Sequence, residues 1–307
     1  TGDGLFRLDQ CFMRDYDDEE AMLHYLADAF RECTTIISFN GKSFDLPLLR
    51  TRFIQQRIPC RLDGLLHLDL VHTARRLWKR RLADCSLGNL EREVLSVERH
   101  GDVPSYLIPQ LWLDYLYSRD ARPLEGVFYH HRYDILSMVT LVGLLAERLD
   151  RSDGAAFEHA EDQLSLVRLH FKRRQYEKVI EMAPPFLDQT PPPSLRRECR
   201  EMLALACKRR NRFTELYEAL QAWHEEFPAD AEAAAEYAKY LEHRLRDWKG
   251  AVRVCQKTLD HLQSSGSFYR DMARNPMRIA LEQRMERIER KIARGNRPED
   301  DIFDEDP

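Results

Sequence analysis

Two acidic residues that are far apart in the sequence stand where carboxylates commonly do chemistry. The first, Asp45, follows a β-branched run (Thr34–Phe39) and a turn at Asn40-Gly41, so it comes where a buried strand leads into a helix. Binding sites of α/β proteins lie at that edge of the sheet. The alternative is a helix cap, because Asp is a favoured N-cap residue and Pro47 follows two residues later. Taken alone, position 45 favours the cap.

His130 and Asp134 are four residues apart in a segment with helical periodicity, so they occupy one face of a helix, one turn apart. Asp134 leads into an apolar stretch, and a buried carboxylate is unfavourable unless it is paired or bound to a metal ion. Carboxylate oxygens suit divalent cations, and a histidine that titrates near neutral pH can accept a proton from water. The alternative is a surface acid whose partner is His130.

Basic residues close to Asp45, and in a second segment further along, are candidates for contact with phosphates. Trp78 lies among them and is a candidate for stacking on a base. The alternative is a solvated helix face, because these side chains point in several directions around a helix. The basic candidates are Arg50, Arg52, Arg75, Arg76, Lys79, Arg80 and Arg81.

A third group, His67, Asp69 and His72, superficially resembles a metal cluster. Side chains alternate along a strand, so His67 and Asp69 share one of its faces. For this group structural hydrogen bonding is the favoured interpretation.

Strands that alternate with helices indicate an α/β domain over residues 1–149. Alternation of apolar and polar residues predicts a strand at Leu5–Met13, and β-branched or apolar runs predict further strands at Thr34–Phe39 and Leu65–Val71. Helices are expected from the acidic run at residues 15–20 to Phe30, and over Leu46–Gln56, Ala74–Leu82 and Pro123–Arg148.

The second half of the chain carries no strand signal. Polar and small residues at 150–160 indicate a linker, residues 161–292 are expected to be all-helical, and the acidic residues 293–307 form a solvated tail. Three helical units align on Tyr176, Phe213 and Trp248, which are 37 and 35 residues apart. That spacing is close to the period of tetratricopeptide repeats, about 34 residues.

The composition excludes some classes of protein. Of 307 residues, 47 are basic and 52 acidic, which excludes a simple basic coat for nucleic acid but not a nucleic-acid enzyme. Seven scattered cysteines without a C-x-x-C motif indicate reduced thiols and a cytoplasmic protein. No apolar run approaches the roughly 18 residues of a membrane span, so no membrane association is expected.

Taken together, several ordered segments resemble the DEDD superfamily of 3′→5′ exonucleases, which have a ribonuclease-H-like fold, and within it the YprB-type branch. The matching segments are FNGKSFDLPLLRTRF, HLDLVHTARRLWKRRLADCSLGNLE, GDVP and HHRYDILSM. The resemblance covers Gly4–Arg148, and an α/β nuclease joined to helical repeats also fits that branch. It implies hydrolysis of phosphodiester bonds at single-stranded nucleic-acid ends, with Mg²⁺ or Mn²⁺ as cofactor.

The resemblance assigns roles to individual residues of this sequence. Asp45 matches the acid of the second motif and Asp134 that of the third, so both would be catalytic metal ligands. His130 would orient or deprotonate the attacking water. The residues expected to contact nucleic acid are Asn40, Phe44, Arg50, Arg75, Arg76 and Lys79.

One departure from the superfamily concerns its first motif, a D-x-E pair on the central strand, which has no counterpart before Asp45. The chain is therefore expected to be the inside of a longer reading frame, to lack the first strands and to be nearly inactive alone. Ile36 and Ile37 should then lie on an open strand edge. The alternative function is a non-catalytic nucleic-acid-binding or scaffolding protein, and in either case the helical repeats would bind a protein partner.

Overall fold

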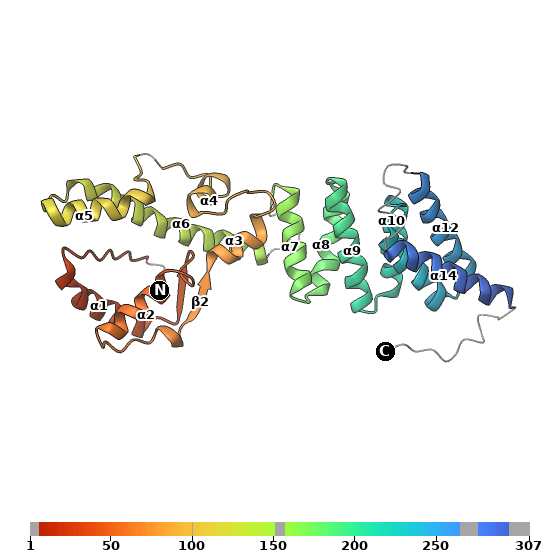
Figure 1. The fold of residues 1–307 in the computed structure, drawn as a ribbon, viewed down its shortest axis with the longest axis horizontal. Helices are drawn as coiled ribbons and strands as arrows, with labels where there is room; N and C mark the ends of the chain where they lie inside the picture. Colours follow the sequence, from red (N-terminus) through yellow and green to blue (C-terminus); the bar gives the residue numbers. More distant parts are fainter. Residues whose placement is uncertain (1–5, 100, 151–156, 265–275, 295–307) are drawn as a thin grey trace. The chain divides into compact units, whose positions relative to one another are not determined.

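The computed structural model describes residues 6–99, 101–150, 157–264 and 276–294. The chain divides into two compact units, Thr1–Arg151 and Ser152–Pro307 (Figure 1). The division falls inside the 150–160 segment that the sequence marks as a linker, and the 295–307 tail lies outside the described residues. None of the described helices is both long and apolar enough to cross a bilayer.

The first unit combines a two-stranded parallel sheet with helices. β1 (Thr35–Ser38) pairs with β2 (Leu66–Asp69), and the register sets Ser38 beside Asp69 at the carboxyl ends of both strands. The other elements of this unit are η1 (Tyr16–Asp18), α1 (Glu19–Glu32), α2 (Asp45–Gln55), η2 (Leu62–Gly64), α3 (Leu70–Trp78), α4 (Leu87–Glu93), η3 (Ser105–Leu107), α5 (Ile108–Ser118), η4 (Arg122–Leu124) and α6 (Glu125–Asp150).

β1 is an edge strand, because within the described residues it pairs with β2 alone. The Ile37 residue is 44% exposed, and Ile36 on the other face is half-buried. The predicted open edge is confirmed. Ile36 packs instead on the apolar core that α1 and α2 form around Leu23 and Phe53.

The strand predicted at Leu5–Met13 is wrong over its described part, since residues 6–13 have no regular secondary structure. This segment lies against α5 and α6 rather than beside a strand. Phe12 packs on Tyr115 and Phe128, with 5.3 Å between ring centroids in both pairs, and Gln10 donates to the Phe128 carbonyl at 3.0 Å. The apolar residues Leu8, Phe12 and Met13 are half-buried, and no backbone ladder forms in residues 6–13.

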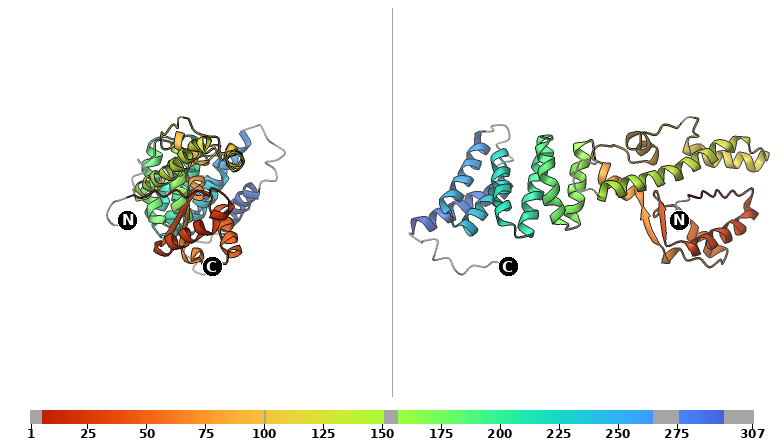
Figure 2. Two further views of the ribbon diagram at one scale, coloured as in Figure 1. Left: turned by 90° about the vertical axis from the view of Figure 1, so that its left-hand side faces the viewer. Right: turned by 180° about the vertical axis from the view of Figure 1, so that it is seen from behind.

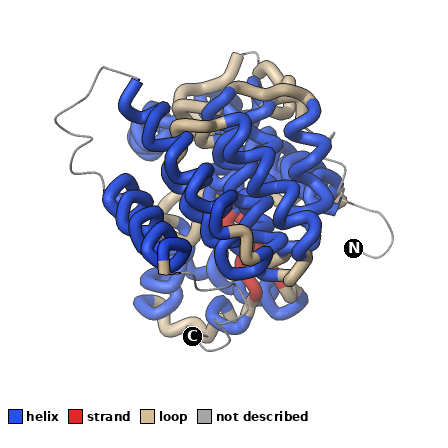
Figure 3. Tube along the Cα trace, turned by 90° about the vertical axis from the view of Figure 1, so that its right-hand side faces the viewer, coloured by secondary structure: helices blue, strands red, loops and turns tan. Residues whose placement is uncertain are grey.

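The described part of the second unit is helical throughout (Figure 3). It consists of α7 (Ala160–Lys172), α8 (Tyr176–Asp188), α9 (Pro193–Arg209), α10 (Phe213–Glu226), α11 (Ala231–Tyr240), a π-helical turn η5 (Leu241–Leu245), α12 (Trp248–Ser264) and α14 (Pro276–Ala293).

Three helix pairs of this unit share one kind of turn. The residues on which the sequence aligns the three units, Tyr176, Phe213 and Trp248, are the first residues of α8, α10 and α12. Two positions before each of them stands a residue with left-handed backbone: Arg174, Asn211 and Arg246 have φ of 58°, 54° and 55°. A recurring turn at this spacing returns each second helix onto the first, and α7 packs on α8, α9 on α10 and α11 on α12.

Candidate functional site

A cavity of about 480 Å³ lies beside α6 at the position of His130 and Asp134. Its polar lining residues come from α4 and the residue before it, the segment before η3, η3 itself and α6: Ser86, Glu91, Arg99, Asp102, Ser105, His130 and Asp134. Two helices and an irregular segment thus supply the groups that converge there. The sequence singled out only His130 and Asp134 among them as candidate functional residues.

His130 and Asp134 lie together, as their spacing on α6 predicts. Nε2 of His130 is 3.4 Å from Oδ2 of Asp134 and 3.4 Å from the Ser105 hydroxyl. Nδ1, the other ring nitrogen, is 2.7 Å from Oδ1 of Asp102. The imidazole therefore bridges two carboxylates, and its own side chain is 15% exposed at the cavity wall.

Arg99 neutralises part of this acidic group. Its Nη2 donates to Oδ1 of Asp134 at 2.7 Å and also to Glu91, while Nη1 donates to Oδ2 of Asp102 at 3.3 Å. The Arg99 side chain is only 8% exposed. Burial lowers the pKa of Arg99, but hydrogen bonds to Glu91 and Asp134 more than offset that effect, so its pKa is raised and it stays a cation. Three carboxylates around one guanidinium leave the group with net negative charge.

A close contact between α6 and the segment before η3 holds Asp102 in place. A Cβ atom on Gly126, in the first turn of α6, would overlap Cγ2 of Val103. The missing side chain lets the 102–104 backbone approach the helix one turn before His130. This approach brings the Asp102 carboxylate within reach of the imidazole.

Asp45 lies elsewhere in the first unit, at the first residue of α2, where it follows the turn after β1. A Cβ on Gly41 would be 2.5 Å from Ser38 Oγ and 3.4 Å from Asp45 Oδ2, so only glycine fits this turn. Among the described residues no hydrogen bond links Asp45 to His130 or Asp134. Figure 2 shows α6 alongside α4 and α5, whereas α2 lies with α1 and the sheet. Asp45 is not among the residues that line the cavity beside α6, and its predicted meeting with Asp134 stays a prediction.

The resemblance implies a bound divalent cation, and the positions of the acidic side chains show whether they could hold one. Within the described ranges no group of three or more His, Cys, Asp or Glu side chains is arranged to hold a metal ion. Asp134 is already bonded to Arg99, and Asp45 is exposed at α2. The residues as placed do not fit a two-metal site, because Mg²⁺ and Mn²⁺ need several oxygen ligands free of competing cations.

Asp69 has the structural role that the sequence analysis favoured for it. It is 3% exposed and accepts hydrogen bonds from the backbone N–H groups of Asn40 at 2.8 Å, Lys42 at 3.0 Å and Val71 at 3.2 Å. Burial raises the pKa of Asp69, but these backbone hydrogen bonds outweigh it and the pKa is lowered. Its neighbour His67 bonds with the Ser38 hydroxyl at 2.7 Å. Asp69 thus ties the β1 turn to the start of α3.

The turn held by Asp69 carries two of the predicted nucleic-acid contacts. Asn40 has left-handed backbone, with φ of 68°, and an exposed side chain, and Phe44 is 66% exposed. Arg50 is ion-paired with Asp63 on the surface, and Arg52 with Glu19. Both side chains therefore have carboxylate partners within the unit.

The basic segment forms α3, which begins earlier than predicted, at Leu70. Arg75, Arg76 and Lys79 are exposed on this helix or at its end, and no ion pair occupies them within the described residues. Trp78 is 0% exposed, so its proposed stacking on a base is wrong. Trp78 and Leu77 point into the core because the apolar face of α3 packs inward.

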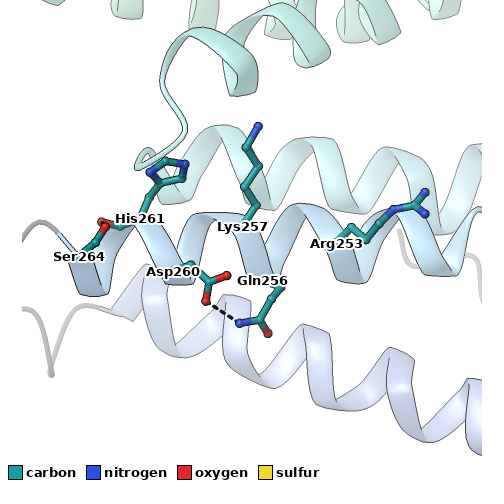
Figure 4. Close-up of a pocket in the computed structure, with 6 residues that line it drawn as sticks. All are labelled: Arg253, Gln256, Lys257, Asp260, His261 and Ser264. Carbon is teal, nitrogen blue, oxygen red and sulfur yellow. Dashed lines mark hydrogen bonds between the residues drawn. The ribbon is translucent and has the colours of Figure 1, made fainter.

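A second hollow, of about 490 Å³, lies along α12 in the other unit (Figure 4). Its six lining residues, Arg253, Gln256, Lys257, Asp260, His261 and Ser264, all belong to that helix, and Gln256 donates to Asp260 at 2.7 Å. The hollow is therefore lined by the polar face of this one helix. None of these residues was expected to be functional.

The comparisons with known proteins agree with the fold of the first unit. Residues 1–146 match the family model described as RNase_H superfamily. The chain is 31% identical over 242 residues to the uncharacterized protein YprB of Bacillus subtilis (strain 168), an alignment that covers 74% of this chain and 55% of that relative. The chain thus spans about half the length of the curated relative it matches. No solved structure matches it.

The family match and the helical second unit lead to one assignment. Residues 1–146 are a ribonuclease-H-like domain of the RNase H superfamily, followed by a largely helical region.

Proposed function

We propose that the protein is a nuclease of the DEDD 3′→5′ exonuclease type, acting on single-stranded nucleic-acid ends, with its candidate active site at the cavity beside α6. The pairing of His130 with Asp134 at that cavity carries the proposal. Both residues occupy the positions that the HHRYDILSM segment assigns to the general base and the third-motif acid. The superfamily match of residues 1–146 supports hydrolysis of nucleic acid as the class of reaction.

His130 is the proton acceptor of the proposed reaction. Its Nε2 atom lies at the cavity, where a water molecule can be deprotonated as it attacks phosphorus. Asp134 would orient that water, since its Oδ2 lies beside the same nitrogen. Arg75, Arg76 and Lys79 are positive groups on the same unit that are suited to phosphate oxygens, with Arg50, Asn40 and Phe44 as further candidates for contact.

The implied Mg²⁺ or Mn²⁺ would use Asp45 and Asp134 as ligands. Because these residues do not assemble a metal site as described, no step is assigned to a metal ion in this chain. The proposal for this chain is limited to the proton acceptor, its neighbouring acid and the phosphate-binding residues.

A hydrolysis assay tests the proposal. The purified chain is incubated with end-labelled single-stranded DNA or RNA, with Mg²⁺, Mn²⁺ or EDTA, next to Asp134→Asn and His130→Gln. We expect only weak shortening from the 3′ end in this chain, and both substitutions should abolish it. Equal activity in Asp134→Asn would overturn the assignment of this site.

The second candidate function is that of a non-catalytic nucleic-acid-binding protein. The ion pair between Arg99 and Asp134 favours it, because the guanidinium of Arg99 binds the carboxylate that a metal ion would need as a ligand. Filter binding with the same oligonucleotides discriminates between the two. Binding without hydrolysis under every metal condition supports the second candidate.

For the second unit we propose tetratricopeptide-like repeats that bind a protein partner. The 37- and 35-residue spacing of α8, α10 and α12, each entered through a left-handed residue, supports this assignment. Copurification of partner proteins with the whole chain, compared with the chain lacking residues 157–294, would show whether binding of a partner requires this unit.

A further inference from the structure

The GDVP segment has no role in the function proposed above, although its aspartate is part of the cavity. Asp102 lies just before η3 and its side chain is 26% exposed. It contacts His130, Arg99 and its own neighbour Val103, whose N–H it accepts at 2.9 Å. A carboxylate with three partners of this kind can hold another side chain in one orientation.

The contact between Asp102 and His130 decides which ring nitrogen carries the proton. Oδ1 of Asp102 is 2.7 Å from Nδ1 and can only accept a hydrogen bond, so Nδ1 must be the protonated atom. Two other contacts favour the opposite assignment, but both are longer: the Nη1 donor of Arg99 is 3.4 Å from Nδ1, and the Oδ2 acceptor of Asp134 is 3.4 Å from Nε2.

We infer that Asp102 is the positioning residue of the site, and that it fixes the orientation and the tautomer of the His130 ring, with hydrogen on Nδ1 and the lone pair on Nε2. The inference deepens the proposed nuclease function, in which Nε2 accepts the proton. A neutral imidazole protonated at Nε2 would have no lone pair there and could not act as base.

Arg99 holds the two carboxylates that flank the His130 ring. Its guanidinium donates to Oδ2 of Asp102 and to Oδ1 of Asp134, so one rigid group sets both carboxylates relative to the ring. The Ser105 hydroxyl, 3.4 Å from Nε2, is a donor that is compatible with a lone pair on that atom.

The structure also predicts what happens when Asp102 is removed. In Asp102→Leu, Nδ1 keeps only the Arg99 donor beside it, and Nε2 keeps the Asp134 carboxylate at 3.4 Å as an acceptor. These two contacts favour hydrogen on Nε2, and the Ser105 hydroxyl beside that atom can turn to accept it. The tautomer of His130 should therefore invert, not merely lose order.

¹⁵N NMR of the whole chain with labelled histidine tests this inference without any nuclease assay. The chain has 11 histidines, so the signals of His130 are those absent from His130→Gln. Spectra are followed to rising pH until the ring is neutral. We expect the unprotonated nitrogen to be Nε2 in the wild type and in Asp134→Asn, and Nδ1 in Asp102→Leu.

A wild-type ring protonated at Nε2, or a ring unchanged in Asp102→Leu, would overturn the inference. The wild-type spectrum decides by itself if the variant does not fold. Asp120→Leu, at a half-exposed aspartate outside the cavity, is the matched control and should leave the His130 signals in place.

If the proposed hydrolysis is observed, a kinetic readout follows. Asp102→Leu should lower kcat by about 10²- to 10⁴-fold, the range of general base catalysis, with little change in KM. Asp102→Glu should restore part of that loss, because it returns an acceptor to Nδ1. Absence of hydrolysis in the wild type would refute the proposed function, while the tautomer spectra would still decide the role of Asp102.

Discussion

Nη2 of Arg99 donates a 2.7 Å hydrogen bond to Oδ1 of Asp134, across 35 residues of sequence. The same nitrogen bonds Glu91, whose side chain is 3% exposed. The acid that the sequence marks as a metal ligand is therefore held by a buried cation of the same unit. This pairing joins α4, α6 and the segment between them, and it determines the charge of the cavity.

Arg99→Gln should destabilise the first unit strongly. It leaves Glu91 buried without its counter-charge, and breaking a buried ion pair by removing one partner costs about 3–5 kcal/mol. Urea unfolding of the first unit, followed by tryptophan fluorescence, measures the effect. The matched control is Arg122→Gln, whose side chain is 90% exposed beside Asp120, and which should change stability little. A similar loss in both variants would contradict the central role of Arg99.

Asp69→Ala should destabilise the sheet edge, because three backbone N–H groups lose their shared acceptor. Hydrogen bonds to a charged group contribute about 1.5–3 kcal/mol each, but they are not additive, so we expect a loss of about 3 kcal/mol at neutral pH. Asp63→Ala, at a side chain that is 79% exposed, is the control and should have a smaller effect.

The contribution of Asp69 should also depend on pH with a defined sign. Its pKa in the folded chain is below the ordinary 3.8, so the unfolded state binds the proton more readily. The stabilisation is fully present above pH 3.8 and is lost as the pH falls through the lower folded pKa. Denaturation of wild type and Asp69→Ala from pH 7 downward should give a difference that shrinks only in acid. A constant difference would show that the charge is not responsible.

Gly126→Ala should displace the Asp102 segment from α6. The new methyl group would overlap Cγ2 of Val103, a stiff side chain, and overpacking of this kind costs about 1–3 kcal/mol. Gly143→Ala on the same helix meets nothing within 4 Å and should stabilise by about 0.5–1 kcal/mol. Thermal unfolding of the two variants should therefore shift in opposite directions. Stabilisation by both would mean that the Val103 contact is not close.

Replacement of Arg75, Arg76 and Lys79 by Gln should lower the affinity for single-stranded oligonucleotides. It should also make that affinity less dependent on salt. The slope of log K against log salt should fall by about 0.7 for each phosphate contact removed. Fluorescence anisotropy at several salt concentrations measures it. Arg31→Gln with Arg122→Gln, at exposed residues of other elements, serves as control. An unchanged slope in the triple variant would exclude α3 from the nucleic-acid interface.

Local features of the sequence determined most of the secondary structure. β-branched runs bounded by turn residues place β1 and β2, and helical periodicity places α1, α2 and α6 within a few residues of their observed bounds. The aligned residues Tyr176, Phe213 and Trp248 even mark the starts of helices, because the turn before each is a short-range structure. The i, i+4 contact of His130 with Asp134 follows from the same local geometry.

Only the tertiary structure decided what surrounds these elements. Residues 6–13 have strand-like alternation but pack on α5 and α6, and Trp78 lies among cations in sequence yet faces the core. Arg99 and Asp102 carry no local signal for their roles, because their partners on α6 are 28 to 35 residues away and are chosen by how α6 packs on α4. Periodicity reports which face of an element is buried; it does not report which charged side chain meets another once those faces are in contact.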